Sequence, residues 1–125
     1  MNRILLVEDE ENISLLYLSE LEAEGYEVLV ETDGKNAVRK AIEEEPDLVI
    51  MDINLPAQMD GLEAMSKIQA SGKAIPVIIN TSYSHYKDNF LAWAADEYII
   101  KSADLSELKN AIKRVLKKKR QSKYA

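Results

Sequence analysis

The feature that most constrains this chain is an apolar run over residues 48–51 that leads directly into Asp52. A short continuous apolar run is typical of a strand buried on both faces, so it predicts a strand of a parallel sheet. A carboxylate inside such a strand would be costly, and we therefore expect Asp52 at its carboxyl end. Ligands bind at that edge in open α/β sheets. The alternative is that Asp52 only begins a turn, because Asn54 and Pro56 follow it.

Further apolar runs alternate with helical patterns along the rest of the chain. The other predicted strands cover residues 4–7, 28–30, 77–79 and 98–100. Amphipathic spacing predicts helices over 10–24, around 37–42, over 61–70, weakly near 90–93 and after Asp104, which with Glu107 has the spacing of a capping box. Five βα units in strict alternation predict a parallel sheet with helices on both faces. Right-handed crossovers then bring all strand ends to one edge.

Composition narrows the class of protein. The chain has 125 residues, which suits one domain, and we expect a domain over 1–120 with a basic and polar tail over 121–125. A net charge of -6 disfavours nucleic-acid binding, and the basic run 117–120 is typical of a solvated helix end. The absence of cysteine excludes disulfides and thiolate metal sites. No apolar run approaches transmembrane length, so we expect a cytoplasmic protein without membrane contact.

Chemically active side chains follow four of the predicted strands. Glu8 and Asp9 follow the first, Asp52 the third, Thr81 the fourth and Lys101 the fifth. If the first and third strands are neighbours, three carboxylates converge, and oxygen ligands without His or Cys favour Mg²⁺. Lys101 and Thr81 add a positive charge and a donor, which suits a phosphoryl group on a carboxylate. Each residue alone has an ordinary structural explanation, but their joint placement argues against it.

Several short motifs in this order carry a resemblance to a known family. They are Glu8-Asp9, Asp52 within Met-Asp-Ile-Asn-Leu-Pro, Asp60-Gly61, Thr81, and Tyr98-Ile-Ile-Lys101. Along nearly its whole length the chain resembles the receiver domain of two-component response regulators. The resemblance implies a flavodoxin-like α/β fold, a three-layer sandwich whose five parallel strands have the order 2-1-3-4-5.

The resemblance also implies how the site works. Asp52 would accept a phosphoryl group from a sensor histidine kinase or a phosphotransfer protein. Asp9, Asp52 and the backbone carbonyl of Asn54 would hold Mg²⁺, with Glu8 acting mainly through water. Lys101 would pair with a phosphate oxygen. No catalysis is expected beyond self-phosphorylation and self-dephosphorylation at Asp52.

Signalling residues are implied in the same way. Thr81 would bond a phosphate oxygen and Tyr98 would turn inward behind it, switching the face of the family's fourth helix, fifth strand and fifth helix. That face would contact an unknown downstream protein or a second copy of the chain. Asn54 and Tyr83 would tune the lifetime of the phosphate, with Tyr83 shielding it from water.

Four departures from the family pattern stand out. Ser102 replaces the usual proline after Lys101, so we predict a trans bond there, since a non-proline cis bond costs ~2.5–4 kcal/mol. The loop from Asp52 to Gly61 is longer, and we expect it to bulge beside the pocket. The segment 81–98 is shorter, which predicts a stunted fourth helix. Ala94 replaces a glycine, where its Cβ penalises positive φ.

Two rival functions and one question of extent stay open. A phosphatase of the haloacid dehalogenase type also uses a strand-end Asp, but with a second Asp two residues on as general acid. Here that position is Asn54. A pseudo-receiver usually lacks an acid or the lysine, and this chain keeps them. The chain either works alone, as the chemotaxis regulator does, or is part of a longer protein.

Overall fold

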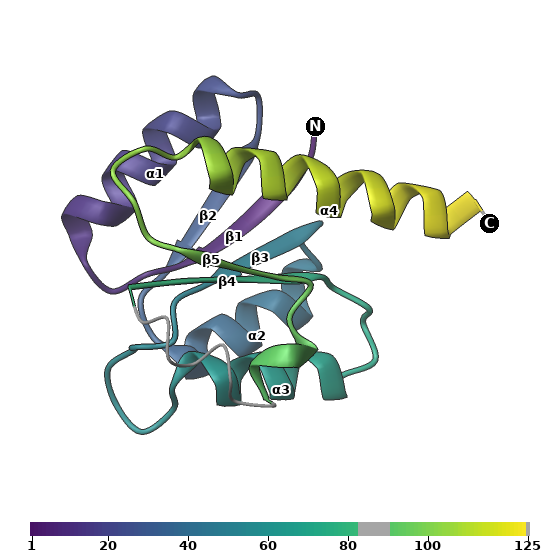
Figure 1. Cartoon of the computed structure of the whole chain (residues 1–125). Helices are drawn as coiled ribbons and strands as arrows, with labels where there is room; N and C mark the ends of the chain where they lie inside the picture. Colours follow the sequence, from purple (N-terminus) through teal and green to yellow (C-terminus); the bar gives the residue numbers. More distant parts are fainter. Residues whose placement is uncertain (83–90, 125) are drawn as a thin grey trace.

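The computed structural model describes residues 1–82 and 91–124, and within them five parallel strands form one sheet (Figure 1). The strands are β1 (Arg3–Val7), β2 (Glu27–Glu31), β3 (Leu48–Met51), β4 (Val77–Thr81) and β5 (Glu97–Ile100). Their order is β2-β1-β3-β4-β5, as predicted. The four residues of β3 are all buried, which confirms that the apolar run is a central strand.

Helices cover both faces of the sheet. They are α1 (Glu11–Ala23), α2 (Gly34–Glu44), α3 (Gly61–Ala70) and α4 (Ser106–Tyr124), with a short 3₁₀ turn η2 (Ala92–Ala94). Helices α1 and α4 lie on one face, and α2 and α3 lie on the other (Figure 1). The three-layer sandwich is therefore confirmed. Because α4 continues to Tyr124, the segment 121–124 is helical, and the boundary expected at 120 stays a prediction.

Each face of the sheet has its own hydrophobic core. Between the sheet and α2–α3 lies one apolar cluster, which includes Leu5, Val49 and Met65. Between the sheet and α1–α4 lies a second cluster that includes Leu6 and Ile50. Alternate residues of β1 and β3 thus serve opposite cores, as expected for strands buried on both faces.

Acidic residues accept hydrogen bonds from the first turns of three helices. Asp33 accepts a hydrogen bond from the Asn36 amide at 2.8 Å and caps α2, and Asp60 accepts one from the Glu63 amide at 2.9 Å and caps α3. Asp104, the predicted cap of the last helix, accepts from the Ser106 amide at 2.9 Å. Its own amide donates to Ser102 Oγ at 3.2 Å. Such caps satisfy amides that the first helical turn leaves unpaired.

The chain departs from expectation mainly around β4 and after it. Strand β4 runs to Thr81 instead of ending at 79, so Asn80 belongs to the sheet. The weak helix expected near 90–93 lies partly outside the described residues, and its described part is η2. Ala94 is not among the residues with positive φ. The described residues contain no cis peptide bond, which confirms the predicted trans bond between Lys101 and Ser102.

No helix in the described parts of the chain is both long and apolar enough to span a membrane.

Candidate functional site

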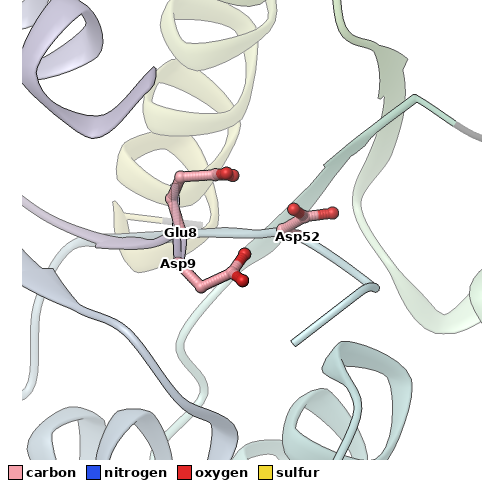
Figure 2. Close-up of side chains that lie close together, drawn as sticks. All are labelled: Glu8, Asp9 and Asp52. Atoms are coloured by element: carbon pink, nitrogen blue, oxygen red, sulfur yellow. The ribbon is translucent and has the colours of Figure 1, made fainter. Parts of the chain in front are cut away.

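Three carboxylates meet at the carboxyl ends of β1 and β3. Glu8 and Asp9 follow β1, Asp52 follows β3, and the two strands pair with Val7 opposite Met51. The Asp52 amide continues the ladder by donating to the Val7 carbonyl at 3.1 Å. Carboxylate oxygens of the three acids lie within 4.8 Å of one another, and Figure 2 shows the side chains close together. The predicted convergence is therefore present.

Lys101 links two of these acids. Its Nζ donates to Glu8 Oε2 and to Asp52 Oδ2, each at 2.8 Å. Its backbone amide donates to the carbonyl of Thr81 at 2.8 Å, which fixes the end of β5 against the end of β4. The Lys101 side chain is 13% exposed, so these ion pairs are largely shielded from water.

Burial and charge shift two pKa values in this cluster. Burial raises the pKa of Glu8 to about 7; the hydrogen bond from Lys101 opposes the rise and the nearby charge of Asp52 adds to it. Burial lowers the pKa of Lys101, but its hydrogen bonds to Asp52 and Glu8 outweigh this, and the net shift is upward. Three ionised carboxylates and one ammonium have a formal charge of -2 together, which a divalent cation would neutralise.

The donor set fits a hard divalent cation. Glu8, Asp9 and Asp52 offer only oxygen ligands, and magnesium prefers carboxylate and water oxygens in proteins. Asp9 is exposed at the pocket, whereas Glu8 and Asp52 are buried, so a cation would reach the cluster from the Asp9 side. The cluster therefore has the chemistry of a Mg²⁺ site.

The main chain after Asp52 is held closely. The Asn54 amide donates to Asp52 Oδ1 at 3.3 Å, and the Gly61 amide donates to the Ile53 carbonyl at 2.8 Å. A Cβ at Gly61 would overlap the carbonyl of Asp52, so this position needs glycine. The start of α3 thus packs directly on the residue that carries the central carboxylate.

A pocket of about 310 Å³ opens above these groups. It is lined by Asp9, Glu10, Asp52, Asn54, Leu55, Pro56, Ser82 and Lys101. Leu55 and Pro56 belong to the lengthened loop, as expected for a bulge beside the pocket, and Ala57 in this loop has a φ of 67°. Ser82 also lines the pocket without having been predicted to, although its place directly after Thr81 was a usable signal. A larger groove of about 770 Å³ lies at the opposite edge of the sheet, away from Glu8, Asp9 and Asp52.

The predicted switch residues are only partly described. Thr81 is fully buried at the end of β4, and Tyr98 is half-buried in β5 against the α2–α3 core. Their switching roles stay predictions. Tyr83 lies outside the described residues, so the structure does not test its expected shielding role.

A family comparison agrees with this geometry. Residues 4–113 match the model of the response regulator receiver domain. This chain belongs to the response regulator receiver family. Its role is therefore that of a phosphoacceptor domain in two-component signalling.

Individual relatives support the assignment. The chain is 38% identical over 123 residues to the response regulator ArlR of Staphylococcus saprophyticus, covering 97% of this chain and 55% of that protein. It is 43% identical to TrrA of Thermotoga maritima, solved with Mg²⁺ and BeF, with a TM-score of 0.88 over 92% of this chain and 99% of that one. A CheY-like receiver protein from Methanospirillum hungatei is 29% identical, with a TM-score of 0.90 over 98% of both chains. The chain thus spans about half the length of the curated relatives it matches.

Proposed function

We propose that Asp52 is the phosphoacceptor and that the site binds Mg²⁺. The observation that carries this proposal is the convergence of Asp52 with Glu8, Asp9 and Lys101, the last at 2.8 Å, at the floor of an open pocket. A carboxylate oxygen of Asp52 forms a bond to phosphorus while the P–N bond of a donor phosphohistidine, or the P–O bond of acetyl phosphate, breaks. A phosphoryl group adds about -1.5 to -2 charge to the site.

Each neighbour has a distinct task in this scheme. Asp9, Asp52 and the backbone carbonyl of Asn54 would hold Mg²⁺, with Glu8 reaching it through water. Bound Mg²⁺ supplies positive charge that stabilises the charge developing on the transferred group. Lys101 exchanges its bond to Asp52 for one to a phosphate oxygen. Thr81 donates its hydroxyl to another oxygen, and Tyr98 follows its movement.

The donor and the output belong to the same proposal. The structure of TrrA in complex with the histidine kinase ThkA, at 43% identity to this chain, supports a histidine kinase as partner. A phosphotransfer protein is an equivalent donor. Output would pass through the face of the family's fourth helix, β5 and α4, the last being the family's fifth helix, to a protein target or a second copy. Asn54 and Tyr83 would set the phosphate lifetime. A cytoplasmic location is part of the proposal. No activity beyond phosphorylation and dephosphorylation of Asp52 is assigned.

Intact mass spectrometry after incubation with acetyl phosphate tests the proposal. The wild type should gain one phosphoryl group only with Mg²⁺, and Asp52→Asn should gain none. Asp33→Asn is the matched control, because Asp33 lies at the same sheet edge and asparagine also caps helices well. An adduct on Asp52→Asn, or no adduct on the wild type with either acetyl phosphate or a phosphorylated kinase, would overturn it. Sustained turnover of a generic phosphate monoester would instead favour a phosphatase.

A further inference from the structure

A buried polar pair interrupts the apolar core between the sheet and α1–α4. Tyr17 of α1 and Asn80 of β4 are 3% and 2% exposed. The Tyr17 hydroxyl donates to Asn80 Oδ1 at 2.7 Å, and Asn80 Nδ2 donates to the Ile99 carbonyl of β5 at 3.0 Å. One side-chain pair therefore joins a helix to two neighbouring strands.

The pair lies among the apolar side chains of this core, which are Ile4, Leu6, Leu21, Leu48, Ile50, Ile78, Ile99, Leu105, Leu108, Ala111, Ile112 and Val115. Burying an amide and a hydroxyl costs desolvation that their hydrogen bonds only partly recover, whereas apolar side chains would gain from burial. The benefit of the pair is that hydrogen bonds are directional. Both bonds can form only when α1, β4 and β5 lie in one relative position.

The three joined segments are those that carry the site. Helix α1 begins two residues after Asp9. Asn80 precedes Thr81, and Ile99 lies two residues before Lys101. In the β4–β5 register Asn80 pairs with Ile99, one step before the last pair, Thr81 and Ile100, so the side-chain bond reinforces the ladder near its end at the pocket.

The pair also lies within electrostatic reach of the site. Burial raises the pKa of the Tyr17 phenol, and the charges of Lys101, Glu8 and Asp52 also act on it. Tyr17 itself lies in the core on the α1–α4 side of the sheet.

We propose that Tyr17 and Asn80 form a positioning pair, which sets Glu8 and Asp9 at one side of the pocket relative to Thr81 and Lys101 at the other. The inference rests on the proposed function of the site as a Mg²⁺-dependent phosphoacceptor. Neither residue lines the pocket, so both act through the segments they join.

Three variants separate positioning from stability. Tyr17→Phe and Asn80→Val each leave a buried polar group without its partner, so each should lower the urea midpoint of unfolding. The double variant replaces the pair with apolar groups and should regain much of that loss. Its Mg²⁺ dissociation constant, measured by calorimetry, should still be about tenfold above the wild-type value, the loss typical when outer support of a metal site is removed. Its phosphorylation by acetyl phosphate should be slower as well.

Tyr26→Phe is the matched control. Tyr26 packs against the same core just after α1, and its loss of a hydroxyl should leave Mg²⁺ affinity unchanged. A double variant with wild-type Mg²⁺ affinity and phosphorylation rate would overturn the inference and leave the pair a structural feature only. If the wild type forms no adduct at all, the proposed phosphoacceptor function fails, while the Mg²⁺ affinities still decide the positioning role.

Discussion

Two neighbouring acids, Glu8 and Asp9, lie in opposite environments at one edge of the sheet. Glu8 is 2% exposed and bonded to Lys101, whereas Asp9 is exposed and lines the pocket. Successive residues at a strand end point to different sides, which separates two chemically similar groups. The closed side, as we call it, consists of Glu8, Lys101 and the Asp52 oxygen to which Lys101 donates. Asp9 and the loop 54–57 form the open side.

The difference assigns separate tasks to the two sides. The closed side is a preformed ion-pair network whose geometry depends on burial and on Lys101. The open side keeps a carboxylate accessible, so a ligand can enter without breaking the core. Substitutions on the closed side should therefore change folding stability together with function, and those on the open side should change function with little effect on stability.

Removing the closed side's cation should have the largest effect. Lys101→Met leaves Glu8 and Asp52 buried and facing each other, so the free energy of unfolding should fall by about 3–5 kcal/mol at pH 8 with EDTA. Urea denaturation measures this. Lys109→Met is the control, because Lys109 makes only longer pairs, at 3.7 and 3.9 Å, to half-exposed or exposed Glu20 and Glu24. The free energy of unfolding of Lys109→Met should fall by at most about 1 kcal/mol. Equal losses would contradict the distinction between the sides.

The titration of Glu8 should give the next largest effect. Its pKa is about 7 in the folded protein against 4.5 for the free side chain, so the folded state binds this proton more tightly. The wild type should therefore lose stability as pH rises from 4.5 to 7, by at most about 3 kcal/mol, and Glu8→Gln should not. The stability of Glu8→Gln relative to wild type should rise across this window in EDTA. Glu10→Gln is the exposed control. If the difference in unfolding free energy between Glu8→Gln and wild type did not change with pH, burial would not raise the pKa of Glu8 on the closed side.

The open side should respond in its ligand affinity instead. Asp9→Asn removes an exposed carboxylate from the pocket, so the Mg²⁺ dissociation constant should rise about tenfold or more, measured by calorimetry. The urea midpoint in EDTA should stay within experimental error of wild type, because surface substitutions of this kind change stability by only about 0.5 kcal/mol or less. A large loss of stability would show that Asp9 also belongs to the closed network.

Much of the fold followed from local patterns in the sequence. The run 48–51 coincides with β3, and the predicted third helix coincides with α3, whose cap Asp60 and starting glycine are adjacent in sequence. The order of the strands in the sheet did not follow from local patterns, because the alternation of strands and helices does not say which strands are neighbours. That order came from the family resemblance, and the structure confirms it.

The convergence of the site residues was predicted, but the individual hydrogen bonds between distant side chains were not. Lys101 meets Glu8 across 93 residues, and Tyr17 meets Asn80 across 63. The fourth strand was expected to end at 79, and asparagine disfavours strands, but Asn80 continues β4 opposite Ile99 and its side chain accepts the hydrogen bond from Tyr17. No local pattern encodes such a partner.

The smallest expected effect concerns the open side's loop. Ala57 and Ala74 have φ of 67° and 55°, a region that glycine adopts without the Cβ penalty. Ala57→Gly and Ala74→Gly should therefore each raise the free energy of unfolding by about 0.5–1 kcal/mol, measured by urea denaturation. Ala74 lines the groove at the opposite sheet edge, so only Ala57→Gly should change Mg²⁺ affinity, through a more mobile Asn54 carbonyl. A rise in the Mg²⁺ dissociation constant of about twofold is expected, since one glycine loosens a loop that Gly61 and Asp52 still hold at its ends. Identical Mg²⁺ affinities in the two variants would mean that the loop shapes the pocket without supporting the cation, and that the open side consists of Asp9 alone.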